Sequence, residues 1–190
     1  SGKNVSFGIV YGVTAKGLQA QVKAKTHQDW SEEKCQQMID MWLGEAYPYV
    51  RYYMERMKHT ARRDGFVRTL TGRRRYLPGV HSTIPRIREE AHRQAINHPV
   101  QGTAAEVIKI AMQNIWYDAL PILWESGIQV RPVLQVHDEL IFEAQADAAE
   151  EVAAIVVDKM QTAMLLCVPV LADYHVTKIV EDGVSWADLK

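Results

Sequence analysis

The pattern of apolar and polar positions along the chain predicts a protein built mainly from helices. Ser31 is a suitable N-cap, because Glu32 and Glu33 follow it in a first turn where the helix dipole favours acidic side chains. We expect helices over residues 3–24, where glycines interrupt the pattern, and over 31–43, 48–63, 84–97 and 147–166.

Extended segments are predicted where β-branched and aromatic residues cluster between turn signals. Short pieces are expected at Phe66–Leu70 and Arg75–Leu77, and longer strands at Val130–Val136, Leu140–Glu143 and Val168–Val180. Helices dominate and one short sheet is expected, so the predicted fold class is α+β and helix-rich.

Pro99 is expected to interrupt the helical pattern, because proline pushes the preceding His98 out of the α region. The segment from Thr103 to Glu106 has the T-x-x-E pattern of a capping box, so a new helix is expected to open there. The apolar side of this helix would consist of Val100, Ala104, Val107, Ala111 and Ile115.

Composition places the chain among ordinary globular proteins. Of its 190 residues, 47% are hydrophobic and 24% are charged, which excludes a disordered or collagen-like chain. No apolar run approaches the roughly 20 residues that a membrane span needs. The cysteines, Cys35 and Cys167, lie far apart, which argues against a disulfide framework and favours a reducing compartment.

The net charge of −1 conceals segments of opposite sign. Residues 51–93 contain twelve basic and four acidic side chains, whereas residues 94–190 contain five basic and fourteen acidic ones. A basic block of this size is typical of a protein that binds a polyanion. The competing interpretation is a solvated helix surface.

A first candidate site is the series Lys3, Phe7 and Tyr11, whose spacing of four places them on one helix face. Gly8 and Gly12 follow the two aromatic residues, although glycine within a helix costs about 1 kcal/mol relative to alanine. A cation and two rings on a glycine-lined face suit a phosphate, a sugar and a base. The alternative is an aromatic stripe buried in a core.

Two further groups suit nucleic acid. Arg73 and Arg74 open the run Arg-Arg-Arg-Tyr, and guanidinium forks match phosphate oxygens. Arg93, Asn97 and Gln101 are again spaced by four, and such side chains read acceptors at groove edges. The proline inside this second span makes one continuous helical face doubtful. A solvated loop and an ordinary polar surface are the alternatives.

A fourth candidate lies at the tip of the longer predicted hairpin, where His137, Asp138 and Glu139 separate two apolar strands. Proteins usually hold Mg²⁺ through one or two carboxylates together with substrate phosphates. The alternative is a polar β-turn, although the tip lacks the usual Asn-Gly or Asp-Gly pair.

These four segments, in this order, resemble the C-terminal part of the family A DNA polymerases, the DNA polymerase I family. The resemblance covers residues 3–189 and is carried by the segments Lys3–Gly12, Asp64–Pro78, Arg93–Ala105 and Gln135–Leu140, with Val184-Ser-Trp at the end of the chain. It implies a helical fingers subdomain over residues 1–85. It also implies the C-terminal part of a palm subdomain over 86–190, with an antiparallel hairpin.

The resemblance implies a role for each nucleotide-facing position. Lys3 would bind the triphosphate of the incoming deoxynucleotide, and Phe7 would line the pocket beside its sugar. Tyr11 would lie by the nascent base pair. The family has phenylalanine or tyrosine at position 7, and phenylalanine is linked with discrimination against dideoxynucleotides.

The resemblance also implies how primer-template DNA and metal would be bound. Asp138 would hold two catalytic Mg²⁺ ions, shared with an upstream aspartate, and Glu139 would be a weaker neighbour. His137 would approach the primer end. The remaining implied DNA contacts come from Arg73, Arg74, Arg93, Asn97 and Gln101.

That second aspartate belongs to a family motif that precedes the Lys3 helix, as does an arginine expected four residues before Lys3. We therefore expect a C-terminal fragment or subunit of a DNA-templated DNA polymerase that is inactive by itself. It would add deoxynucleotides to a primer 3′ end by two-metal phosphoryl transfer once an N-terminal polymerase fragment or subunit joins it. The expected location is intracellular, in the cytoplasm of a bacterial or phage-infected cell, with no membrane partner.

Alternatives stay open at this point. Three explanations are consistent with a start at Ser1: a truncated piece, a naturally split subunit, or the downstream part of an intein-interrupted gene. A non-catalytic DNA-binding accessory fragment is the second function class. A nucleotide-binding hydrolase is poorly supported, because the sequence has no G-x-x-x-x-G-K-[ST] loop.

Overall fold

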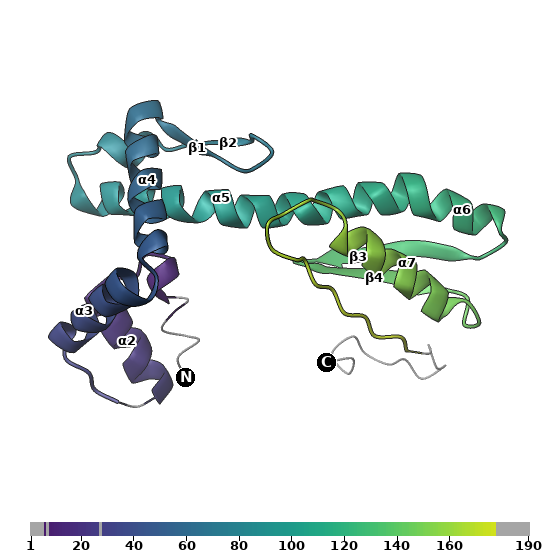
Figure 1. The fold of residues 1–190 in the computed structure, drawn as a ribbon, viewed down its shortest axis with the longest axis horizontal. Helices are drawn as coiled ribbons and strands as arrows, with labels where there is room; N and C mark the ends of the chain where they lie inside the picture. Colours follow the sequence, from purple (N-terminus) through teal and green to yellow (C-terminus); the bar gives the residue numbers. More distant parts are fainter. Residues whose placement is uncertain (1–5, 7, 27, 178–190) are drawn as a thin grey trace. The chain divides into compact units, whose positions relative to one another are not determined.

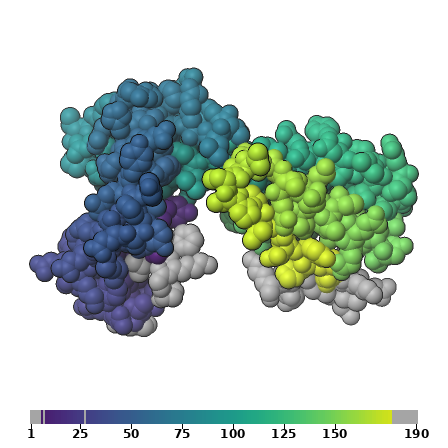
Figure 2. Space-filling model, viewed as in Figure 1, coloured from purple at the N-terminus to yellow at the C-terminus, as the bar shows by residue number. Residues whose placement is uncertain are grey.

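The computed structural model of the protein describes residues 6, 8–26 and 28–177. Its contacts divide the chain into two compact units, Ser1–Thr103 and Ala104–Lys190, and in Figure 2 the side chains of each unit gather into a body of their own. The elements of the first unit are α2 (Ala15–Thr26), α3 (Glu32–Met41), a π-helical turn (Trp42–Ala46), α4 (Pro48–Asp64), β1 (Phe66–Arg68), β2 (Arg74–Tyr76) and a 3₁₀ turn (Pro78–His81).

The helix α5 (Pro85–Asn114) begins in the first unit and ends in the second (Figure 1). The second unit continues with a π-helical turn (Ile115–Ala119), α6 (Leu120–Glu125), β3 (Val130–Val136), β4 (Glu139–Ala144) and α7 (Ala149–Gln161). Within the described ranges, no helix is both long enough and apolar enough to cross a membrane.

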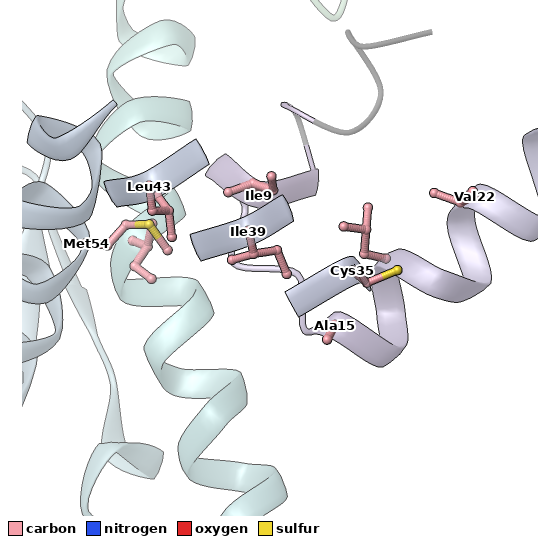
Figure 3. Packing of buried hydrophobic residues seen from close by; sticks show 9 residues of the cluster. Ile9, Ala15, Val22, Cys35, Ile39, Leu43 and Met54 are labelled. Atoms are coloured by element: carbon pink, nitrogen blue, oxygen red, sulfur yellow. The ribbon is translucent and has the colours of Figure 1, made fainter. Parts of the chain in front are cut away.

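The largest core of the first unit lies where α2, α3 and α4 meet (Figure 3). Leu18, Cys35 and Met54 are buried there, one from each helix. Ile9, from the helical segment before α2, and Ile96, from α5, complete the cluster. This core therefore joins the start of the chain to the helix that carries Arg93, Asn97 and Gln101.

A smaller core fixes the β1–β2 hairpin. The strands pair antiparallel, with Val67 opposite Arg75, and Val67 is only 1% exposed. It packs with buried residues from α4, α5 and the segment after β2, namely Ala61, Leu77, Val80, Ala91 and Ala95. One side of the hairpin is therefore anchored and the other side is left for solvent.

The core of the second unit lies between α7, α6 and the β3–β4 hairpin (Figure 1). Val152 and Val156 of α7 pack with Val130 of β3 and with the partly buried Leu140 and Phe142 of β4. The antiparallel pair carries an irregularity in register between Pro132 and Leu134. This packing holds the hairpin from one side and leaves its tip exposed.

The α+β, helix-rich fold class is confirmed, with two small hairpins where one sheet was expected. The predicted cap at Ser31 is also confirmed, because its hydroxyl accepts a hydrogen bond from the Lys34 amide at 3.1 Å. The predicted boundary at residue 85 falls at the start of α5, whereas the two units meet inside that helix. The names fingers and palm stay predictions.

Three local predictions are wrong. Residues 168–177 form no strand, and 178–180 lie outside the described residues; a β-rich run needs a partner strand, and composition does not supply one. The expected break at Pro99 and the capping box at Thr103 are wrong as well, because α5 stays helical through both.

Contacts around Pro99 explain why α5 continues. Proline in a helix removes one hydrogen bond and clashes with the preceding turn, at a cost of about 3 kcal/mol. Here the Tyr53 hydroxyl of α4 donates a hydrogen bond to the Ile96 carbonyl at 2.8 Å, and the Thr103 hydroxyl donates to the Pro99 carbonyl at 2.6 Å. Ala95 and Ile96 are buried in the cores beside α5. Tertiary contacts thus outweigh the local preference of proline.

The Tyr53 hydrogen bond gives a first prediction. Burial raises the pKa of Tyr53 to about 12, so its hydroxyl remains a donor at neutral pH. Tyr53→Phe should lower the free energy of unfolding by about 1 kcal/mol, measured by urea denaturation. Its neighbour Tyr52 is 66% exposed, so Tyr52→Phe should change stability by less than about 0.5 kcal/mol. Equal effects of the two variants would contradict this account.

His92 of α5 is a buried titratable group, with 3% of its surface exposed. Its Nδ1 lies 3.6 Å from a Glu89 oxygen, and no group of the described chain hydrogen-bonds its Nε2. Burial, followed by the positive charge of Arg62, lowers the pKa of His92 below 6.5, while Glu89 opposes this effect.

A pH dependence of stability follows from His92. As the pH falls, His92 is protonated first in the unfolded chain, because an exposed histidine titrates at about pH 6.5 and the folded ring titrates at lower pH. The contribution of the neutral ring to stability is therefore complete above that pH and is lost as the pH falls towards the folded pKa. Wild-type stability should fall more on acidification than that of His92→Asn, measured by urea denaturation. An NMR titration midpoint of the His92 ring above 6.5 would refute the prediction.

Candidate active site

The first candidate group contains Tyr11, whereas Lys3 and Phe7 lie outside the described residues. The helical segment before α2 ends in a turn at Tyr11 and Gly12, and Gly12 adopts a φ of 76°. Its amide donates to the Ile9 carbonyl at 2.9 Å. Glycine takes this left-handed conformation without a Cβ penalty, so it is suited to end a helix.

The same turn lies against α5. A Cβ built on Gly12 would lie 3.6 Å from Cγ of Arg93 and 3.8 Å from Cδ1 of Ile96. The turn that carries Tyr11 is therefore brought beside Arg93, although more than eighty positions separate them along the chain. Tyr11 itself is 37% exposed. The predicted nucleotide-facing and duplex-facing groups thus adjoin at this point.

Arg93, Asn97 and Gln101 share one uninterrupted helix, contrary to the doubt raised by Pro99. Residues four apart drift by about 40° around a helix, so the three positions form one oblique row. Arg93 and Asn97 are half-buried and Gln101 is exposed. Arg93 pairs with Glu90, and this hydrogen bond is the main reason that the pKa of Glu90 is lowered.

The tip of the β1–β2 hairpin is fastened to α5 next to Gln101. The Leu70 amide donates to the Thr103 hydroxyl at 3.1 Å, and the Arg73 amide donates to the Thr69 hydroxyl at 3.1 Å. A Cβ on Gly102 would lie only 2.6 Å from Cγ2 of Thr69, so glycine is needed for this approach. The hairpin tip that carries Arg73 and the helical turn that carries Gln101 are thus held together.

Sequence reasoning missed this fastening. Thr69 looks like an ordinary polar position and Thr103 was interpreted as the start of a capping box, whereas the Leu70–Thr103 hydrogen bond joins segments more than thirty residues apart. One signal was available in Gly102, because a glycine inside a helix is costly and suggests a close neighbour.

The second unit carries the predicted metal-binding turn. Val136 pairs with Glu139, so His137 and Asp138 form a two-residue turn between β3 and β4. His137 has a φ of 53°, a left-handed conformation in which histidine is enriched among residues other than glycine. The Gln135 side chain donates to the His137 carbonyl at 2.6 Å. All three predicted residues are exposed at the tip.

The ion pairs and the register of the β3–β4 hairpin leave the carboxylates of Asp138 and Glu139 exposed at its tip. Arg131 and Glu143 are register partners and form a cross-strand ion pair, with Arg131 Nε 2.8 Å from Glu143 Oε2. No ion pair to Asp138 or Glu139 occurs among the residues that the structure describes. Their oxygens therefore remain available to a cation.

The donor set fits Mg²⁺ in kind but is incomplete in number. Carboxylate oxygens are suitable ligands for this hard cation. However, the described part of the chain contains no group of three or more His, Cys, Asp or Glu side chains that could hold a metal ion. Tyr11, Arg93 and the hairpin tip belong to the first unit and Asp138 to the second.

Arginines gathered on one unit are typical of a nucleic-acid-binding surface, and exposed carboxylates are suitable ligands for a hard cation. Comparisons with known proteins identify the family. The profile of DNA polymerase family A matches residues 1–182. The chain belongs to this family.

Individual relatives agree with this result. The chain is 41% identical to DNA polymerase I of Pseudomonas aeruginosa over 175 residues, and 39% identical to that of Bacillus caldotenax over 188 residues, covering 91% and 99% of this chain. It spans about a fifth of the length of these curated relatives, 18% and 20% respectively.

A solved structure is also similar. It is the POL domain of Pol1 from M. smegmatis in complex with DNA primer-template and dNTP. The match has a TM-score of 0.77 and 37% sequence identity, and it covers 88% of this chain and 28% of that one.

The fastening of the hairpin tip can be tested with Thr103→Val, which removes the hydroxyl and keeps the shape of the side chain. The Leu70 amide should exchange its hydrogen faster, and the free energy of unfolding should fall by about 1 kcal/mol. Thr103→Ser retains the hydroxyl and should preserve slow exchange, and Thr83→Val, at an exposed position, should change neither quantity. Unchanged exchange at Leu70 in Thr103→Val would show that this bond does not hold the tip.

Proposed function

We propose that the chain is part of a DNA-templated DNA polymerase that adds deoxynucleotides to a primer 3′ end. The observation that carries the proposal is the exposed, unpaired Asp138 at a hairpin tip in a chain of DNA polymerase family A. The relatives named DNA polymerase I support it. Because those relatives are bacterial, the proposed place of action is inside the cell.

The proposed substrates are primer-template DNA and deoxynucleoside triphosphates, as in the complex of the similar Pol1 domain. In the first unit, Arg93 would meet the duplex near the primer end and Tyr11 the nascent base pair. This fits their adjacent positions beside Gly12. The other proposed contacts are Lys3 and Phe7 for the nucleotide, and Arg73, Arg74, Asn97 and Gln101 for the DNA.

Asp138 is the proposed metal ligand, with Glu139 beside it and His137 directed to the primer end. Bound Mg²⁺ would supply charge neutralisation at the transferred phosphoryl group and favour ionisation of the primer hydroxyl. The work of this chain is to position its substrates, because phosphoryl transfer needs little covalent help from protein. Asp138 is suited to this task by the paired strands on either side of its turn.

A second carboxylate-bearing segment is part of the proposal. The family resemblance implies a second aspartate on a segment that precedes the Lys3 helix, and two-metal sites of phosphoryl-transfer enzymes stabilise both the attacking and the leaving oxygen. The proposed partner is therefore an N-terminal polymerase fragment or subunit. In its absence, the chain would bind DNA without extending it.

Primer extension tests the catalytic proposal. The chain alone should not extend a primed template with Mg²⁺ and deoxynucleotides. A mixture with an upstream polymerase segment, from its own reading frame or from the Pseudomonas aeruginosa relative, should be active. In that mixture Asp138→Asn should reduce the extension rate by about 10³-fold or more, because charge neutralisation by metal is worth several kcal/mol.

The control is Asp147→Asn, which removes an exposed carboxylate from the same unit and should leave the extension rate unchanged. DNA affinity of Asp138→Asn should also remain close to that of the wild type. Equal extension by Asp138→Asn and wild type would refute the metal-binding role. An inactive mixture whose chain still binds DNA would favour the non-catalytic accessory fragment.

A further inference from the structure

The outer face of the β1–β2 hairpin combines arginines with aromatic rings. Side chains alternate along a strand, so burial of Val67 against α4 and α5 turns its neighbours outwards. Arg68 pairs with Arg74 in register, and Phe66 pairs with Tyr76. These four residues form the outer hairpin face.

Phe66 orders both guanidinium groups of this face. The Cζ atoms of Arg68 and Arg74 lie 4.9 Å and 4.8 Å from the centre of its ring. Tyr76 meets the same ring edge-on, with centroids 5.5 Å apart. Arg68 also donates to the Gly72 carbonyl at 3.2 Å. Two cations are thus held in fixed positions around one aromatic residue.

This arrangement leaves an unbalanced charge. Like charges directly opposite each other on paired strands repel. Asp64, at the end of α4, is already bound by Arg63, with oxygens 2.7 Å and 2.8 Å from its Nε and Nη2. Arg68 is only a minor cause of the lowered pKa of Asp64. No salt bridge to Arg68 or Arg74 occurs within the described chain.

A phosphate matches this pair. Its oxygens accept several hydrogen bonds at once, and guanidinium forks are suited to donate them. A phosphate placed between Arg68 and Arg74 would convert their repulsion into two attractive contacts. The face therefore selects for an anion with several oxygens.

Tyr76 indicates that the phosphate would belong to a single strand of nucleic acid. Its side chain is 66% exposed beside the two arginines, which leaves ring surface for a base. A base inside a duplex has both faces covered by its neighbours, whereas an unpaired base can stack on a protein ring, and basic grooves with exposed rings are the usual sites for single strands.

We propose that the outer hairpin face binds the unpaired part of a primer-template, with one phosphate between Arg68 and Arg74 and the adjoining base on Tyr76. The identity of the ligand as DNA rests on the proposed function. The bonds from the hairpin tip to Thr103 hold this face in place relative to α5. Phe66 acts as a positioning residue, because it orders the arginines without contacting the strand.

Fluorescence anisotropy with the full chain tests this site. The probes are a labelled duplex with a 5′ single-stranded overhang of about ten nucleotides and a blunt duplex of the same paired length. Arg68→Ala/Arg74→Ala should weaken binding of the overhang probe about tenfold and change that of the blunt probe less than about twofold. The slope of log affinity against log salt should become shallower by about 0.7, because one single-strand phosphate contact is lost.

Three further variants separate charge, stacking and general attraction. Arg51→Ala removes an exposed charge of α4, away from the outer hairpin face, and should leave the preference for the overhang intact. Tyr76→Ala should weaken overhang binding without changing the salt slope, whereas Tyr76→Phe should retain it. A circular-dichroism melt of each variant confirms that the fold is kept.

Several results would overturn the proposal. These are equal losses for overhang and blunt probes, no loss for either, or displacement of the overhang by a stoichiometric amount of deoxynucleoside triphosphate, which would indicate a free-phosphate site. Failure of the wild-type chain to bind the overhang probe would also overturn it. The catalytic proposal is tested separately by primer extension, so the overhang-binding proposal and the catalytic proposal can fail independently.

Discussion

The continuity of α5 through Pro99 is the constraint on which the first unit depends. A proline inside a helix is destabilising, and side-chain hydrogen bonds from Tyr53 and Thr103 reach the carbonyl of Ile96 and that of Pro99 itself. If α5 broke at this point, Arg93 and Gln101 would not share one helical row. The turn at Tyr11 contacts this helix before Pro99 and the hairpin tip contacts it after Pro99, so the break would separate Tyr11 and Arg93 from Gln101 and the hairpin tip.

Both hairpins are anchored on one side by a small core and carry exposed charged side chains elsewhere, and the charges are of opposite sign. One side of each is fixed by a small core, through Val67 in the first hairpin and Phe142 in the second. The anchored side supplies the burial energy, and the other side or the tip can then carry charges without neutralising partners. The basic segment of the sequence thus places arginines on the β1–β2 hairpin, and the acidic segment places carboxylates at the tip of the β3–β4 hairpin.

Local features were predictable from the sequence, and long-range ones were not. The cap at Ser31 and the hairpin around Asp138 depend on residues within a few positions of one another. The course of α5 at Pro99 depends on Tyr53, more than forty residues away, and no local pattern reveals that bond. The run after residue 168 is rich in β-branched residues, yet a strand requires a partner.

The candidate site was found through its motifs, because each motif is short and contiguous. Which motifs meet is a different question, since it depends on packing. The neighbourhood of Gly12 and Arg93, and the fastening of the tip by Thr103, came only from the structure. Arg68 was visible as one more basic residue in a basic block. The proposed role of Arg68 depends on the register that places Arg68 opposite Arg74, and on the Phe66 ring that both guanidinium groups contact.

The proposed metal site links assembly to the cation. Two carboxylates brought close together repel unless a cation lies between them, so a site divided between two segments is unfavourable without Mg²⁺. Asp138 sits exposed on a turn that the paired strands and the core of the second unit already hold. This chain therefore needs little rearrangement to present its ligand. In this proposal, metal binding would also hold the partner segment, because the free energy of binding at a site shared by two parts stabilises their association.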